Sequence, residues 1–180
     1  MALRESESTT GQAVWYDGGL CFTCRRCNGC CGGAPGYVWV EEPETARIAA
    51  FLGMPVPDFV RRYCRKVWWR TSLTEMPGGD CVFLSPRGCQ IYSVRPMQCR
   101  TFPFWPDLVE APARWEREKG RCPGIGNGRL YSRSEVEQIG RYGEKTGTNH
   151  ILLRVQWPGL GQKMAVRSLE RLGRVVEQLK

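Results

Sequence analysis

Apolar side chains recur at helical spacing in two stretches of the first third of the chain. Between Glu44 and Leu52, alanines and other apolar residues gather near one side. A second stretch runs from about Pro57 to Trp68, where Phe59, Tyr63 and Val67 follow one another at four-residue steps. The pattern therefore predicts two short helices here.

Three further helices are predicted in the second half. The stretch from about Pro106 to Lys119 has a weak helical pattern. Ser132 to Lys145 is a stronger candidate, because Ser132 and Glu135 have the spacing of a capping box. The last segment, about Gly161 to Leu179, carries an apolar stripe on an otherwise polar sequence and predicts an amphipathic helix.

Strand signals are short. Tyr37–Glu41 is β-prone. Cys81–Leu84 and Cys89–Tyr92 flank Ser85–Gly88, whose Ser-Pro-Arg-Gly sequence is typical of a turn, so we expect a β-hairpin. Between Tyr92 and Pro106 several prolines interrupt regular structure, and we expect an irregular segment.

These elements predict an α+β fold with a small, irregular, cysteine-rich and metal-centred core, a β-hairpin and several packed helices. At 180 residues the chain is long enough to bury an apolar core without disulfides. We expect a single domain over residues 1–180. Its metal-binding core would span about 21–128, and a helical part would span 129–180.

The formal net charge of +8 comes mainly from arginine and suggests an anionic partner such as nucleic acid. A second interpretation is that the arginines balance cysteine thiolates, since several lie beside cysteines. These are Arg25, Arg26, Arg65, Arg87, Arg100 and Arg121. The first ten residues lack an apolar signal-peptide core, and no apolar run reaches the length of a membrane span. We therefore expect a cytoplasmic protein without a membrane partner.

Ten cysteines are the main candidates for chemistry. In a reducing compartment clustered thiols favour a metal over disulfides. Eight of them form the predicted ligand set: Cys24, Cys27, Cys30, Cys31, Cys81, Cys89, Cys99 and Cys122. Cys64 lies alone in a predicted helix and is expected to be a core residue. Cys21 keeps the two-residue step of the others, and its role stays open.

Spacing bears on the type of centre. Adjacent Cys30 and Cys31 should point apart, so either one of them serves a second centre or stays free, or a multinuclear cluster takes both. Cys24, Cys27 and Cys30 have the C-x2-C-x2-C spacing of bacterial ferredoxins, which also use a remote Cys-Pro such as that at Cys122. The sequence favours an iron–sulfur cluster of the [4Fe-4S] type, with zinc as the alternative.

Other catalytic patterns are weak. His150 is the only histidine, which argues against multi-His metal sites and against Ser–His or Cys–His catalysis. No phosphate-binding P-loop or G-x-G-x-x-G motif is present. Arg95 and Arg100 flank Cys99 and either bind an anionic substrate or hold loop carbonyls and sulfurs. The aromatic residues from Phe102 to Trp105 are expected to shield the centre from water.

The same residues resemble the YkgJ-type cysteine-cluster family, whose CxxCxxCC domain is described as zinc- or iron-chelating. The matching motifs are Phe22–Cys31, Asp80–Leu84, Cys89–Tyr92, Arg95–Pro103 and Cys122–Gly126, and they cover roughly Cys21 to Gly128. The resemblance implies a metal or iron–sulfur centre. A flagellin lysine methylase shares the domain, so enzymatic use is implied by analogy only, and whether this chain is an enzyme stays open.

Three functions follow from this pattern. The first is a cysteine-ligated iron–sulfur centre used in redox or cluster-assisted chemistry. The second is a zinc-stapled binding module that contacts an anionic partner through its arginines. The third is a metal chelation or delivery protein, in which adjacent cysteines exchange ligands.

Overall fold

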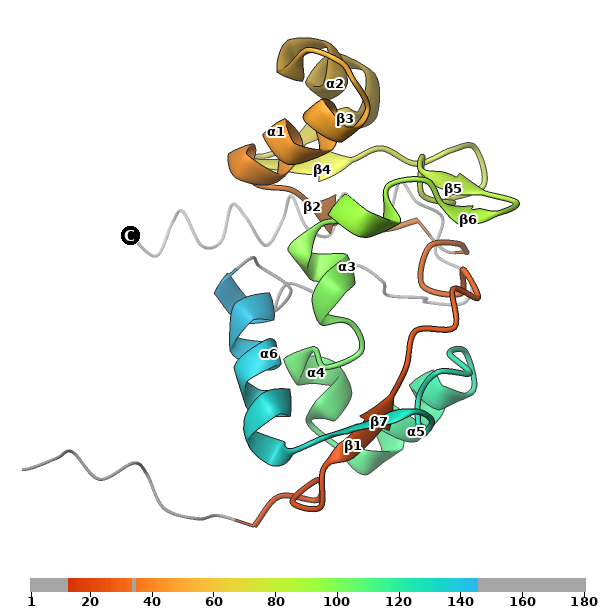
Figure 1. Cartoon of the computed structure of the whole chain (residues 1–180), viewed down its shortest axis with the longest axis vertical. Helices are drawn as coiled ribbons and strands as arrows, with labels where there is room; N and C mark the ends of the chain where they lie inside the picture. Colours follow the sequence, from red (N-terminus) through yellow and green to blue (C-terminus); the bar gives the residue numbers. More distant parts are fainter. Residues whose placement is uncertain (1–12, 34, 146–180) are drawn as a thin grey trace, which may run out of the picture.

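The structure is a computed structural model and describes residues 13–33 and 35–145. It combines helices with three small antiparallel sheets, which confirms the α+β fold (Figure 1). The helices are α1 (Glu42–Phe51), α2 (Val56–Tyr63), the 3-10 helix η1 (Tyr92–Val94), α3 (Met97–Thr101), α4 (Pro106–Val109), α5 (Pro112–Lys119) and α6 (Arg133–Lys145). The strands are β1 (Leu20–Phe22), β2 (Val38–Trp39), β3 (Cys64–Val67), β4 (Arg70–Leu73), β5 (Leu84–Ser85), β6 (Gly88–Cys89) and β7 (Arg129–Tyr131). The expected helix over 161–179 and His150 lie outside the described residues.

The upper part of Figure 1 is built from α1, α2 and the three-stranded sheet β2-β4-β3. Its apolar core includes Ile48, Phe59, Leu73 and Phe83, all at most 2% exposed. Helix α1 starts two residues earlier than predicted. The reason is a capping box, in which Glu41 begins the helix and the side chain of Glu44 accepts the Glu41 backbone N–H at 3.0 Å.

The prediction that the second helix reaches Trp68 is wrong. Helix α2 ends at Tyr63, and the chain continues as strand β3. Cys64 pairs with Leu73 and Val67 with Arg70, so β3 and β4 form a hairpin closed by two residues. Val67 has the four-residue spacing of a helix, but it is β-branched, and it and its neighbours form backbone hydrogen bonds with strand β4. These bonds favour the strand over the helix.

The lower part contains β1, β7 and helices α4, α5 and α6 around a second apolar core. The predicted helix over Pro106–Lys119 is two helices, α4 and α5. The break falls at Ala111, whose extended backbone (φ −143°, ψ 144°) is the conformation that a following proline imposes. Helix α6 begins as predicted, since Ser132 N–H donates to Glu135 at 2.9 Å and Glu135 N–H donates to the Ser132 hydroxyl at 3.4 Å.

The expected hairpin around Ser85–Gly88 is present but short, because only the β5 and β6 pairs Leu84–Cys89 and Ser85–Gly88 are formed. The segment from Tyr92 to Pro106 is more regular than expected. It contains η1 and then α3, which starts directly after Pro96. A proline at a helix start leaves the helical hydrogen bonds intact, so Pro96 and Pro106 begin helices instead of preventing them.

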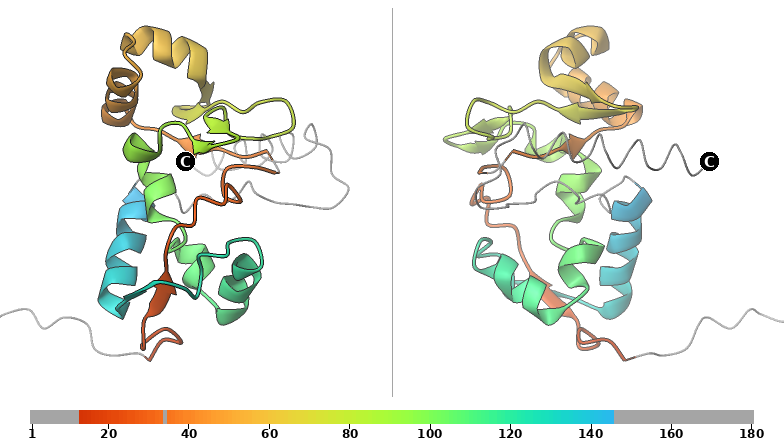
Figure 2. Two further views of the ribbon diagram at one scale, coloured as in Figure 1. Left: turned by 45° about the vertical axis from the view of Figure 1, so that its right-hand side comes forward. Right: turned by 180° about the vertical axis from the view of Figure 1, so that it is seen from behind.

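The cysteine loop connects the two cores. It leaves β1 in the lower part, passes between hairpin β5-β6 and the segment around residue 121, and enters β2 in the upper part (Figure 2). The Cys81 backbone N–H donates to the Cys31 carbonyl at 2.8 Å, which ties the loop to the hairpin segment. On the other side, a Cβ built on Gly29 would lie 2.9 Å from the Arg121 carbonyl oxygen, so the loop also runs close to the Cys122 segment.

Helix α3 is anchored to the upper part by two polar side chains, the buried Glu44 and the partly buried Gln98. The Glu44 carboxylate accepts the Met97 backbone N–H at 2.6 Å. The Gln98 side chain accepts the Trp39 N–H at 2.8 Å and donates to the Tyr37 carbonyl at 3.0 Å. These contacts fix the position of α3.

We expect replacement of Glu44 by alanine to lower the free energy of unfolding by about 1–3 kcal/mol, because the partly buried N–H···O bonds from Glu41 and Met97 lose their acceptor. Urea unfolding followed by circular dichroism measures the change. Glu42→Ala is the matched control, since Glu42 lies exposed on the same helix and should stay within about 0.5 kcal/mol of the parent. Equal stability of both variants would contradict the anchoring role.

Among the described helices, none combines the length and the apolar character that crossing a bilayer requires.

Candidate metal centre

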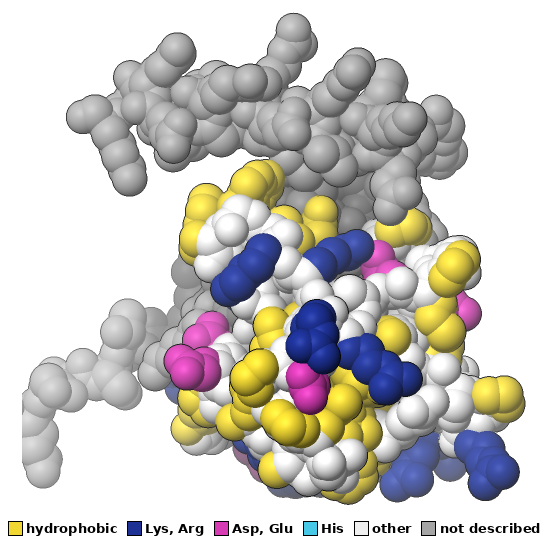
Figure 3. Space-filling view, turned by 90° about the horizontal axis from the view of Figure 1, so that it is seen from above, with side chains coloured by type: hydrophobic (Ala, Val, Ile, Leu, Met, Phe, Trp, Pro, Cys, Tyr) yellow, Lys and Arg dark blue, Asp and Glu magenta, His cyan; other side chains and the backbone are white. Residues whose placement is uncertain are grey.

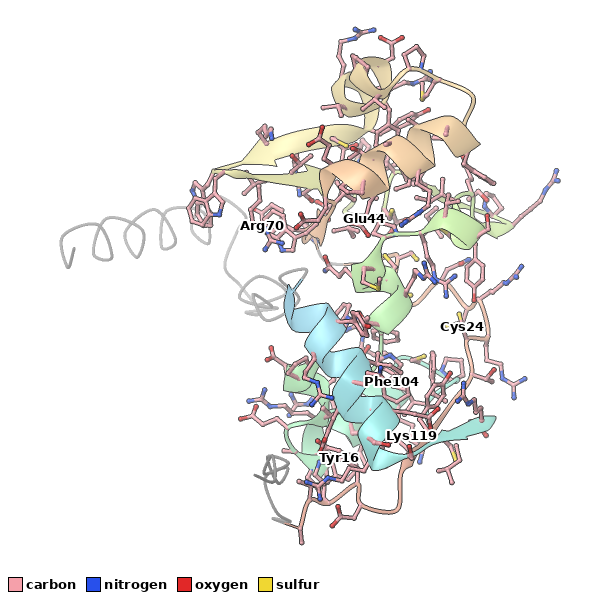
Figure 4. The ribbon with its side chains drawn as sticks, turned by 60° about the vertical axis from the view of Figure 1, so that its left-hand side comes forward. Tyr16, Cys24, Glu44, Arg70, Phe104 and Lys119 are labelled. Atoms are coloured by element: carbon pink, nitrogen blue, oxygen red, sulfur yellow. The ribbon has the colours of Figure 1, made fainter. Side chains whose placement is uncertain are left out.

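The thiols of the cysteine loop lie near the surface. Cys24, Cys27 and Cys30 are exposed and Cys31 is partly buried. The labelled Cys24 lies at the edge of the molecule in Figure 4. Asn28 adopts a left-handed backbone (φ 66°), and its carbonyl accepts the Cys31 N–H at 2.8 Å. This tight turn folds the loop back on itself, as a short segment that presents several thiols must do.

The remote cysteines are less exposed and share one local geometry. Burial raises the pKa of the thiols of Cys81, Cys89 and Cys122. In each case a hydrogen bond from the backbone N–H two residues further along the chain acts in the opposite direction and lowers the pKa of the thiol. The donors belong to Phe83, Ile91 and Gly124, and Cys122 receives a second one from Ile125. Backbone N–H groups aimed at sulfur favour the thiolate, which is the form that binds metals.

The two groups of thiols interact electrostatically. The Sγ atoms of Cys30 and Cys31 lie 3.7 Å apart, so the expectation that these adjacent side chains point apart is wrong. The pKa of the Cys31 thiol is raised by its hydrogen bond with Cys30, by burial and by the charges of Cys30, Cys99 and Cys81. In α3, burial raises the pKa of Cys99, and the charges of Cys81, Cys30 and Cys89 add to it.

Cys122 joins this group from the lower part of the molecule. Besides burial, the charges of Cys27 and Cys30 raise its pKa. The charge of Cys24 acts in the same way on Cys89. Thiols that are remote in sequence therefore interact in the fold. Within residues 13–33 and 35–145, however, no three Cys, His, Asp or Glu side chains are grouped closely enough to hold one metal ion. The eight-cysteine ligand set stays a prediction.

The remaining two cysteines lie elsewhere. Cys21 is in strand β1, paired with Leu130 of β7. Cys64 is at the start of β3 and packs against the core of the upper part, as expected of a core residue, although it lies in a strand and not in a helix.

Cys64 should make stability fall at alkaline pH. Burial raises the pKa of its thiol from 9.0 to about 11. The raised pKa adds stability that is complete below about pH 9 and is lost as the pH rises through 11. Two pKa units correspond to about 2.7 kcal/mol, and we expect about half of this because Cys64 is partly exposed.

Unfolding of the parent and of Cys64→Ala at pH 8 and pH 11 measures this contribution. The parent should lose about 1.3 kcal/mol more than the variant between the two pH values. An equal loss in both proteins would show that the Cys64 thiol titrates alike in the folded and unfolded chains.

Sequence reasoning missed Tyr92. Its ring is flanked by the guanidinium groups of Arg26, at 4.2 Å, and Arg95, at 3.9 Å. A side-chain hydrogen bond with Cys24 and then burial raise the pKa of the Tyr92 hydroxyl. Arg95 also donates to the Tyr92 carbonyl at 2.7 Å, which confirms a structural role for this arginine. Cation–π contacts of this kind hold the cysteine loop against the η1 segment.

The aromatic residues after Cys99 belong to the lower core. Phe102 and Phe104 are buried there together with Cys122, and both rings pack edge-on against Phe22. The labelled Phe104 lies inside the molecule in Figure 4. Cys122 thus shares an apolar core with these rings, and their shielding of the centre from water stays a prediction.

Comparison with known proteins identifies the family. Residues 23–124 match the CxxCxxCC family, whose description reads "Putative zinc- or iron-chelating domain". The chain belongs to this family. The match covers more than half of the 180 residues and contains all eight predicted ligand cysteines. Membership in a chelating family supports metal binding by this chain.

A curated relative is the "Uncharacterized protein MJ0661" of Methanocaldococcus jannaschii, 34% identical over 91 residues. The aligned residues make up 49% of this CxxCxxCC-family chain and 48% of the relative, so the chain spans about half the length of that protein. No solved structure matches the chain.

Proposed function

We propose that this CxxCxxCC-family protein carries a cysteine-ligated iron–sulfur centre of the [4Fe-4S] type, used in redox or cluster-assisted chemistry in the cytoplasm. Its ligands come from Cys24, Cys27, Cys30, Cys31, Cys81, Cys89, Cys99 and Cys122. The observation that carries this proposal is the backbone N–H aimed at the sulfur of each of Cys81, Cys89 and Cys122. A neutral thiol is a weak acceptor, whereas a thiolate bound to a metal gains from such donors.

The distribution of the thiols supports a cluster. Cys30 acts on the pKa of Cys31, Cys81, Cys89, Cys99 and Cys122, which reach it from the loop, the hairpin, α3 and the lower core. A multinuclear cluster collects ligands from a wider volume than a single ion does. Thiolates alone also form the usual donor set of such clusters.

A bound cluster supplies one-electron redox chemistry, with a potential set by its surroundings. The chain would set that potential through named groups. Backbone N–H donors stabilise negative charge on the sulfurs, and the Arg95 guanidinium lowers the pKa of Cys89 and Cys99, after the larger effects of burial and neighbouring groups. Phe102 and Phe104 keep water from the core side of Cys122.

Anaerobic purification followed by metal and sulfide analysis tests the proposal. We expect about four irons and four acid-labile sulfides per chain, with a brown colour that bleaches on reduction. A colourless protein with stoichiometric zinc and no sulfide would reject the cluster.

Zinc is the second candidate, and the Cys30–Cys31 contact favours it. Two thiolates on a tetrahedral zinc, each about 2.3 Å from the ion, lie about 3.8 Å apart. The 3.7 Å between the Cys30 and Cys31 sulfurs matches this spacing. In that case the protein would be a zinc-stapled module for an anionic partner. The exposure of Cys24, Cys27 and Cys30 also suits metal delivery, since exposed thiolates can exchange a metal with another protein.

A further inference from the structure

The tip of the β3-β4 hairpin exposes two tryptophans. Trp68 and Trp69 form the two-residue turn between the paired residues Val67 and Arg70. Their side chains are 55% and 83% exposed, and the rings stack with centroids 5.8 Å apart at an interplanar angle of 24°. Large aromatic side chains contribute most when they are buried, so this degree of exposure calls for an external partner.

The backbone of the turn strengthens this argument. Trp68 has a left-handed conformation, with φ 53°, in which glycine or asparagine is favoured and a bulky residue is strained. The strain is retained although the Trp68 side chain is more than half exposed. A side chain held at this cost without burial indicates selection for contact outside the chain.

The charge around the tip is positive. Lys66 is exposed close to the turn, and Arg70 follows the turn directly. Lys66 donates to the Thr71 hydroxyl at 2.9 Å, and the Arg70 guanidinium lies 4.3 Å from the centre of the Trp39 ring. Among the described carboxylates, Glu41 acts on Arg70 and raises its pKa, after the larger lowering effect of burial, so Lys66 and Arg70 outnumber it at the tip. An anionic surface therefore complements the hairpin.

We propose that the Trp68–Trp69 tip docks this protein peripherally on an anionic lipid surface. Indole rings favour the headgroup region of a bilayer, where the apolar ring and the polar N–H are both accommodated, and lysine or arginine beside them attracts acidic lipids. This proposal revises the expectation of no membrane partner. It is independent of the metal centre, since Arg70 at the hairpin and Cys24 in the cysteine loop lie at opposite edges of Figure 4.

Single-stranded nucleic acid is the weaker partner class. Stacking of nucleic-acid bases needs free aromatic faces next to a row of basic side chains. Here the Trp68 and Trp69 rings stack on each other, so each has one face already covered. In the view from above, basic side chains are spread among apolar ones and do not form a continuous stripe on that face (Figure 3).

Vesicle partitioning of the full-length, metal-loaded protein tests the proposal. We expect binding to phosphatidylcholine vesicles that contain about 30% phosphatidylserine, with a blue shift of tryptophan emission. Trp68→Gly combined with Trp69→Ser should lower the partition coefficient at least about tenfold, while metal content and melting temperature stay at or above the parent values, because glycine relieves the turn. Lys66→Gln should reduce binding to the acidic vesicles alone.

Phe51→Ala is the matched control, because Phe51 is a 51% exposed aromatic at the end of α1, and it should bind as the parent does. Unchanged partitioning of the double tryptophan variant would overturn the proposal. Failure of the parent protein to bind the acidic vesicles would also overturn the proposal, whether or not the protein binds an oligothymidylate through the same two residues.

Discussion

Replacing Cys30 with serine should remove most of the bound metal from the protein. Cys30 is the thiol whose charge reaches the largest group of other candidate ligands, from Cys31 to Cys122. Loss of an outer hydrogen bond to a metal ligand commonly costs 10- to 100-fold in affinity, so loss of this ligand should cost more than about 100-fold. Metal content per chain after anaerobic purification, with the visible spectrum, measures the effect.

Cys64 supplies the matched control for Cys30→Ser, and Cys21 is tested beside it. Cys64→Ser removes a thiol that packs against the upper core, and Cys21→Ser removes one from strand β1. We expect the Cys64 variant to keep the parent metal content. The Cys21 variant settles whether that residue belongs to the ligand set. Parent-like metal content in Cys30→Ser would remove Cys30 from the centre and with it the proposed convergence of the thiols.

Replacing Gly124 with alanine should strongly destabilise the protein. A Cβ at this position would lie 2.1 Å from the Thr23 carbonyl oxygen and 3.1 Å from its carbon. The Thr23 N–H also donates to the Gly124 carbonyl at 3.1 Å, so neither backbone segment can move without breaking a contact. We expect a loss of about 3 kcal/mol in the free energy of unfolding.

The Gly124 change should also weaken the centre, because the Gly124 N–H donates to the sulfur of Cys122 and Thr23 leads into the cysteine loop. Denaturant unfolding and metal analysis of the same samples measure both effects. Gly18→Ala is the control, since a Cβ there meets nothing within 4 Å. If Gly124→Ala matches Gly18→Ala in stability and metal content, the close approach of the two segments does not hold.

Local signals in the sequence predicted several elements well. The Ser132–Glu135 capping box marks the start of α6, and the Ser-Pro-Arg-Gly turn marks the β5-β6 hairpin. Both features are encoded within a few residues, so no distant contact is needed to form them. Where the prediction failed, as at Cys64–Val67, the deciding partner was strand β4, and a ladder with another segment outweighed helical spacing.

The sequence by itself determined which ligand type a metal site here would use. The chain has a set of cysteines at ligand spacing and one histidine, a composition typical of metals bound by thiolates. The tertiary structure decided which thiols influence one another. The Cys30 and Cys31 sulfurs lie 3.7 Å apart, and the charge of Cys30 acts on the pKa values of Cys81, Cys89, Cys99 and Cys122, which belong to both parts of the molecule. Side-chain direction depends on backbone turns and on packing between remote segments, and spacing along the chain does not contain that information.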